Sequence, residues 1–264
     1  MPLYHPEPTS DDEEEEKIPF YKRKPPKPVM LHEMEEFLKH PPKPPPSQPQ
    51  DTTLWMQDRH LEDAHIKVLA EHVEKGHFDF VEVMHLAHNP FGPKGMGLLA
   101  VAMGHGNMPK IYHLNIGYVN LGVEGGRAFA SLLHAIPLLQ QLEVNYNNLM
   151  DDGAKAIFDE GAKGHLKTMS YLYMKGNGFA DGAMEAFCEA FKSGKMESLI
   201  HCVFGENDVG DEGMLCLANG IEDGDFAKCR HIDMSPARNV GVDGKEVIEN
   251  VIKEYSIKPL HVIF

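Results

Sequence analysis

The sequence predicts an α/β solenoid: a horseshoe with parallel strands on its concave side, helices on its convex side and an extended tail before it. One apolar pattern recurs after residue 51, with anchor positions at 59, 89, 119, 147, 177, 207 and 238. In each unit, strand-like alternation precedes the anchor and helical spacing follows it. Composition also changes near residue 51, because 13 of the 19 prolines precede it. Regular repeats of this length indicate a stacked repeat array.

Composition and charge narrow the class of protein. Of the 264 residues 42% are hydrophobic, which is enough for a core, and the formal charge of −15 opposes non-specific binding to nucleic acid. We expect no membrane insertion, because no run of apolar residues is long enough to span a bilayer, and the N-terminus is neither a signal nor a transit peptide. Four cysteines without a C-x-x-C pair favour an intracellular, cytoplasmic location, with the cysteines acting as small core residues.

The change in composition predicts two parts: a proline-rich, charged tail at residues 1–50 and the repeat domain at residues 51–264. The tail carries an acidic run, 11–16, and a basic cluster, 22–27, and it cannot fold alone. One stretch, near 29–39, has the spacing of a short amphipathic helix that is either a weakly helical tether or a docking segment. Its apolar residues are candidate partner contacts: Leu31, Met34, Phe37 and Leu38.

The strands come first in each unit. The unit Val81-x-x-Met84-x-Leu86-x-x-Asn89 shows the pattern, in which alternate residues face the core. The predicted strands lie near 54–57, 81–87, 111–117, 139–145, 169–175, 199–205 and 229–234. The segment 260–262 is a candidate eighth strand that would cap the sheet.

A turn and a helix follow each strand. The anchor asparagines, Asn89, Asn147, Asn177 and Asn207, are expected to be structural, with buried amides that bond the backbone of the turn. The predicted helix starts carry acids, which we expect to cap the free N–H groups of their own helices. These acids are Asp63, Glu124, Asp151, Asp152, Asp181, Asp211, Glu212 and Asp243.

The L-x-x-L-x-L-x-x-N-x-L pattern with its 28–31-residue period resembles leucine-rich repeats. The long period and the helical second half resemble the ribonuclease-inhibitor-like subclass, as in Ran GTPase-activating proteins and NOD-like receptors. The resemblance covers roughly residues 51–258, and the sequence departs from it at Arg59, Val119 and Arg238, where asparagine is expected. The resemblance implies the horseshoe fold and a function in binding proteins.

No motif for catalysis stands out. The sequence lacks a P-loop, a dinucleotide-binding glycine pattern and a nucleophile elbow. The segment from His32 to Glu36 lacks the second histidine of a zinc helix, and 222–225 is too short for a calcium loop. We therefore expect a non-enzymatic protein without cofactor, metal or small-molecule substrate.

The residues that face away from the core on the strands form columns across the repeats. They include the only tryptophan, two tyrosines and four histidines, residue types that are favoured in binding hot spots. A solvated strand face is the alternative, and a metal site at His85 with His113, or at His201 with His231, is a weaker one. The candidate partner-binding residues are Trp55, His85, His113, Asn115, Glu143, Tyr171, Tyr173, Lys175, His201, His231 and Asp233.

These observations favour a protein–protein interaction scaffold. By resemblance we expect a structural subunit of a larger intracellular assembly, such as a cytoskeletal or ciliary one, that binds other subunits through the concave face and the tail. The alternative is a regulator that activates a small GTPase by supplying a side chain in trans. The arginines that such a role could use are Arg59, Arg127 and Arg238.

Overall fold

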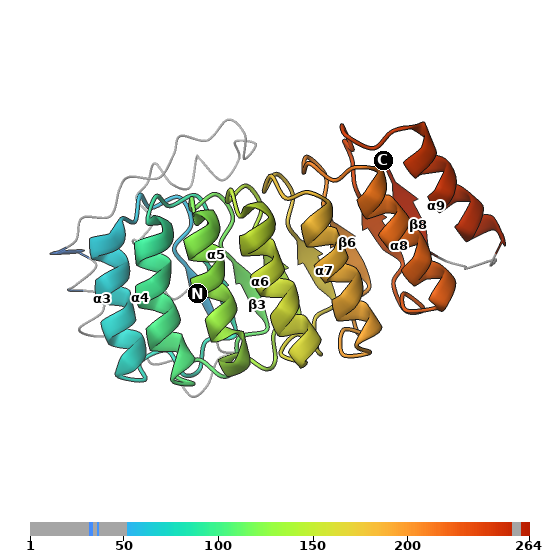
Figure 1. The fold of residues 1–264 in the computed structure, drawn as a ribbon. Helices are drawn as coiled ribbons and strands as arrows, with labels where there is room; N and C mark the ends of the chain where they lie inside the picture. The colour runs from blue at the N-terminus through green and yellow to red at the C-terminus, as the bar shows by residue number, and fades with distance from the viewer. Residues whose placement is uncertain (1–31, 34–35, 37–51, 255–259) are drawn as a thin grey trace, which may run out of the picture.

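The computed structural model describes residues 32–33, 36, 52–254 and 260–264. Its eight strands form one sheet in chain order, β1 to β8, and every neighbouring pair is parallel. Helices α3 to α9 are stacked side by side along one face of this sheet (Figure 1). The predicted α/β solenoid is confirmed: the described part of the chain is a repeat array in which each of the first seven strands is followed by a helix.

Each strand spans three residues. The strands are β1 (Thr53–Trp55), β2 (Val83–His85), β3 (His113–Asn115), β4 (Gln141–Glu143), β5 (Tyr171–Tyr173), β6 (His201–Val203), β7 (His231–Asp233) and β8 (His261–Ile263). The helices are α3 (Asp63–Glu74), α4 (Gly92–Gly104), α5 (Gly122–Leu132), α6 (Met150–Lys163), α7 (Asp181–Lys192), α8 (Asp211–Asp223) and α9 (Val242–Glu254), with a 3-10 turn η2 (Leu133–Ala135) after α5.

The anchor spacing predicted the positions of the first seven strands but made them too long, and the eighth candidate, 260–262, is strand β8 at 261–263. The backbone ladder does continue past each strand, as where the N–H of His88 donates to the carbonyl of Gly117 over 2.9 Å. The chain there already turns, because His88 has a φ of +57°. The same left-handed conformation recurs just before the anchors at Asp58, Tyr118, Tyr146, Gly176 and Glu206. Extended geometry therefore ends earlier than the apolar alternation suggests.

The core lies between the sheet and the helices. The central residue of each of the first seven strands is at most 1% exposed. The helices add large side chains to this core, such as Phe129, Phe158 and Phe187, each 0% exposed. Towards the C-terminal repeats the phenylalanines contact one another, with Phe191 stacked on Phe226 at 4.2 Å. The central strand residues are Leu54, Met84, Leu114, Leu142, Leu172, Cys202 and Ile232.

The anchor asparagines connect consecutive repeats. Asn147 donates through Nδ2 to the carbonyls of Ile116 and Val144 at 2.7 and 3.1 Å. Its Oδ1 accepts the N–H groups of Val119 and Leu121, both from the preceding repeat, at 3.1 and 3.2 Å. Asn89, Asn177 and Asn207 make equivalent bonds, and all four are at most 5% exposed. The structural role expected for them is confirmed.

The acids at the helix starts act differently from our expectation. Asp151 accepts the N–H of Ala180 at 2.6 Å, and Asp181 accepts the N–H groups of Gly210 and Gly213 at 2.7 and 3.0 Å. Asp211 likewise accepts the N–H of Gly241 at 2.7 Å. None of these bonds lies within the helix that carries the acid, so the prediction of self-capping is wrong for these three. They cap the entry to the helix of the next repeat, because parallel stacked helices place that entry beside them.

Candidate protein-interaction surface

The parallel register lines up the outward-facing strand residues as predicted. The first residues of the strands form one column and the third residues form a second, and each residue lies opposite its equivalent in the next strand. We call these two columns, with Lys175 beside them, the concave face. The first column ends in His261 and the second in Ile263 of β8, two residues that sequence reasoning left out.

At its N-terminal end the concave face carries stacked rings. Trp55 lies flat on His85, with ring centroids 4.1 Å apart, and His85 meets His113 edge-on at 4.9 Å. Trp55 is 42% exposed, whereas His85 is only 9% exposed because its neighbours cover it. His85 is one of the candidate partner-binding residues, but Trp55 and His113 cover most of its ring, so little of it is open to a partner. Burial first, and the nearby His113 second, lower the pKa of His85 to about 4, so this ring is neutral at pH 7.

Glu143 is the centre of a polar network in the middle of the face. Its carboxylate accepts hydrogen bonds from His113, Asn115 and Gln141 at 2.8 to 2.9 Å. The hydrogen bond from His113 is the main cause that lowers the pKa of Glu143, with burial acting in the opposite direction. A half-buried carboxylate with three donors holds its neighbours in fixed rotamers. This part of the face is therefore rigid and negatively charged.

The C-terminal half carries tyrosine and histidine. The ring of His201 lies 5.8 Å from Tyr173, 6.4 Å from Tyr171 and 5.4 Å from His231. His231 stacks in turn on His261 at 5.4 Å. Tyr171 is 40% exposed, while burial lowers the pKa of His201 and raises that of Tyr173. Asp233 points into its own turn, where Ser235 donates to it through both N–H and hydroxyl.

A second aromatic row, which sequence reasoning missed, follows the turn at the end of the strands. His88 stacks on Tyr118 at 4.3 Å, and Tyr118 stacks on Tyr146 at 4.5 Å. The hydroxyl of Tyr146 donates to Glu206 at 3.1 Å, and Lys175 pairs with the same carboxylate at 3.1 Å. All of these residues except Lys175 stand one position before an anchor. Reading that column across the repeats would have found the row.

The candidate residues of the tail and the arginines considered for GTPase activation are not part of the concave face. Leu31, Met34, Phe37 and Leu38 lie outside the described residues. Arg127, one of the arginines considered for GTPase activation, holds ion pairs with Glu124 at 2.9 Å and with Asp152 at 2.6 Å. All three side chains are at the surface, and that of Arg127 is 49% exposed.

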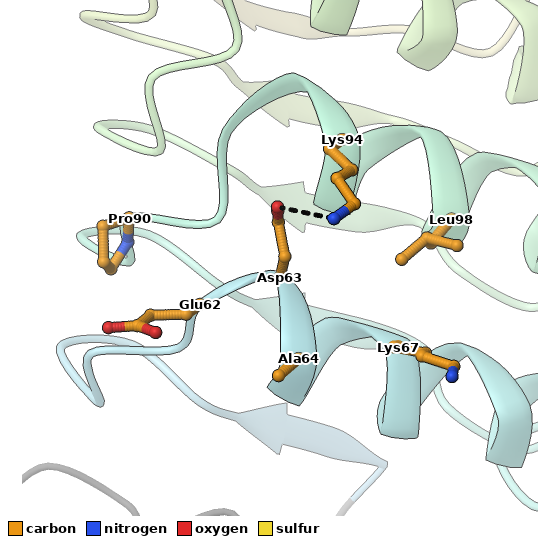
Figure 2. Close-up of a pocket in the computed structure, with 7 residues that line it drawn as sticks. All are labelled: Glu62, Asp63, Ala64, Lys67, Pro90, Lys94 and Leu98. Atoms are coloured by element: carbon orange, nitrogen blue, oxygen red, sulfur yellow. Dashed lines mark ion pairs between the residues drawn. The ribbon is translucent and has the colours of Figure 1, made fainter.

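A hollow of about 610 Å³ lies on the helix side, between α3 and α4 (Figure 2). Lys94 and Asp63 face each other across it at 3.8 Å. By its place in the repeat Asp63 should accept the N–H of Gly92, but that group donates to the carbonyl of Val119, and Asp63 Oδ1 has no hydrogen-bond partner among the described residues.

The described residues were also compared with the requirements of a metal site and of a membrane-spanning helix. Among them, no three histidine, cysteine, aspartate or glutamate side chains are arranged to hold a metal ion. Within the same part of the chain, no helix has the length and apolar character that crossing a bilayer requires.

Comparison with known proteins agrees with this architecture. A family model described as "Leucine Rich repeat" matches residues 136–158, from before β4 into α6, and residues 203–218, from the end of β6 into α8. The mouse (Mus musculus) protein "NACHT, LRR and PYD domains-containing protein 12" is 28% identical over 171 residues, or 64% of this chain. The chain spans only 16% of that relative's length.

Two solved structures are also similar. The yeast Rad7–Elc1 complex has a chain with a TM-score of 0.47 and 12% identity, covering 88% of this chain and 59% of its own. An internalin of Listeria monocytogenes has a TM-score of 0.45 and 10% identity, covering 80% and 52%.

Proposed function

We propose that this leucine-rich repeat protein is a non-catalytic scaffold that binds other proteins through its concave face and through residues 1–50. The finer proposal is a structural subunit of a larger intracellular assembly, with a ciliary or other cytoskeletal complex as the candidate setting. The repeat fold, typical of interaction domains, supports the general function. The finer setting rests on resemblance alone.

One observation carries the proposal: large aromatic side chains are exposed on a rigid sheet. Trp55 and Tyr171 are 42% and 40% exposed, although each would gain free energy by leaving water. Their backbones are fixed by the strand ladder, and Trp55 is stacked on His85. A partner would therefore bury them at little cost in conformational entropy. This combination is what binding hot spots require.

The polar groups give the face a direction. The Glu143 network presents a carboxylate near the middle, and His201, His231 and His261 follow one another towards β8. A partner that matched both halves could bind in only one orientation, because reversing it would leave polar groups unpaired.

The experiment compares capture of native partners by the full chain and by variants. The double substitution Tyr171→Ala and Tyr173→Ala should preserve the fold and weaken binding by about two orders of magnitude, if each hot-spot aromatic contributes about 1.4 kcal/mol or more. The matched control is Val101→Ala with Leu215→Ala, on α4 and α8, where the side chains are 62% and 50% exposed on the helix side. Quantitative crosslinking and mass spectrometry of captured proteins measures both. If the tyrosine variant retains partners as well as the parent does, the concave face is not the interface.

The role of residues 1–50 needs a separate arm. Deleting them should leave the thermal midpoint of the repeat domain nearly unchanged, while partner retention falls. Contacts made by the charged runs of this segment should weaken above about 0.15 M salt, whereas aromatic contacts on the concave face should not. Unchanged retention after the deletion would remove this segment from the proposal and leave the concave face standing.

A further inference from the structure

A hollow of about 490 Å³ lies at the C-terminal ends of α6 and α7, and lysines make up most of its charged lining. Three segments contribute to it: the end of α6 with the turn after it, the turn after α7, and the turn before β7. Four lysines and one glutamate give the lining a net formal charge of +3, in a chain whose formal charge is −15. We call these residues the lysine hollow: Lys163, Lys167, Lys195, Glu197 and Lys228.

Two of the four ammonium groups are left to bind an anion. Lys163 and Lys228 each pair with a glutamate, at 2.6 and 3.2 Å. Lys167 and Lys195 are exposed and form no ion pair with any residue that the structure describes. A Cβ at Gly164 would lie 3.3 Å from the Cδ of Lys195, so the stem of this lysine lies against the end of α6. The contact brings cations of two neighbouring repeats together.

The helix dipole explains only part of this cluster. Lysines in the last turn of a helix are favoured because the C-terminal end carries partial negative charge. Lys163 is in the last turn of α6, but Lys167, Lys195 and Lys228 lie beyond the helices. The effect of the dipole falls off within the last turn, so it does not account for these three.

We propose that the acidic run of the N-terminal tail, residues 11–16, docks in the lysine hollow of its own chain. The run has six consecutive carboxylates, from Asp11 to Glu16, which match the positive lining in charge. An exposed ion pair contributes little by itself. Several pairs formed together contribute more, and attachment to the same chain keeps the run at a high effective concentration near the hollow.

The chain that joins the run to the repeat domain is long enough for this contact. The turns that form the hollow precede β5, β6 and β7, and residue 52 likewise precedes β1, so both lie at the same edge of the parallel array. Because β5 is four repeats from β1, the hollow lies roughly 40 to 50 Å away, at about 10 Å for each helix step. Residues 17–51 are 35 residues, which span up to roughly 115 Å when extended.

Docking in cis and binding of a partner are alternatives for the same acidic residues. A partner that binds the run must first displace it from the hollow, which lowers the apparent affinity of that partner. The inference concerns a contact within one chain and does not depend on the proposed binding function.

The test is zero-length crosslinking of the full chain at low protein concentration. A carbodiimide joins a carboxylate to an amine in contact with it, and mass spectrometry maps the joined peptides. We expect the run to be joined to Lys167 and Lys195 about tenfold more often than to Lys75 and Lys110. The last two are matched controls, because both are exposed in turns at the same edge and lie in repeats nearer to residue 52. The preference should fall severalfold between about 0.05 and 0.5 M salt.

Two double variants identify the contact. In Lys167→Gln with Lys195→Gln, joining of the run to the other two lysines of the hollow should fall about tenfold. Lys75→Gln with Lys110→Gln should leave that joining unchanged. All four positions are exposed, so we expect the fold to be preserved, which thermal unfolding followed by circular dichroism checks.

An equal mixture of nitrogen-15-labelled and unlabelled chains distinguishes docking in cis from docking on a second copy. Contact within one chain gives joined peptides of a single isotope, whereas contact between copies gives mixed pairs as often as single-isotope pairs. The proposal is overturned if the run is joined to no lysine of the hollow, if the control lysines are joined as often, if mixed pairs reach half of the total, or if high salt changes nothing. These readouts on the parent chain decide the matter even if a variant fails to fold.

Discussion

Replacing Asn147 by alanine should weaken the repeat array in a way that the structure makes calculable. The substitution removes the acceptor of two buried N–H groups, those of Val119 and Leu121, and the donor to the carbonyls of Ile116 and Val144. Each N–H left without a partner costs about 1 to 1.5 kcal/mol, and the carbonyls, which keep a second lone pair, cost less. The expected loss in free energy of unfolding is therefore about 3 kcal/mol.

Urea titration followed by circular dichroism measures this loss. With a slope of about 2.5 kcal/mol per molar urea, the midpoint should fall by about 1 M. The control is Arg238→Ala, because Arg238 occupies the anchor position of the last complete unit and is exposed, so we expect a change within about 0.5 kcal/mol. Equal shifts for the two variants would refute the view that the anchor amide, and not the position alone, holds consecutive repeats together.

Two further predictions follow from single contacts. Gly176→Ala and Gly76→Ala both place a side chain at a positive φ, +66° and +72°, but only at Gly176 would the added Cβ overlap the Tyr146 ring. The thermal midpoint should therefore fall for both variants. The loss in free energy of unfolding should be about 1 kcal/mol for Gly76→Ala and clearly larger for Gly176→Ala. Equal losses would show that the Tyr146 ring moves aside freely. Because the pKa of His85 falls from 6.5 to about 4 on folding, its contribution to stability is fully present above pH 6.5 and is lost as the pH falls towards 4. When the pH is lowered from about 7 to about 5, the urea midpoint should fall more for the parent than for His85→Phe. An equal fall for the two proteins would contradict the assignment to His85.

The repeat spacing was sufficient to predict the strand order, the register and the composition of the concave face. It was insufficient where a residue's role depends on a neighbouring repeat. His85 looked exposed because alternation assigns a side, whereas Trp55 and His113 decide whether that side is covered. Asp181 looked like a cap for its own helix, yet its acceptor reaches Gly210 in the next repeat. These contacts join neighbouring repeats, whereas the sequence pattern describes each repeat separately.

The two kinds of inter-repeat bond have opposite directions along the chain, which matters for how the protein is made. An aspartate such as Asp151 caps a helix entry that is translated 29 residues later. Asn147, in contrast, completes a turn that was translated 28 residues earlier. As the chain leaves the ribosome, helices α7, α8 and α9 thus meet an acceptor already in place, while each anchor asparagine completes the turn of the repeat before it. The growing end therefore carries an incomplete turn wherever the next anchor is an asparagine.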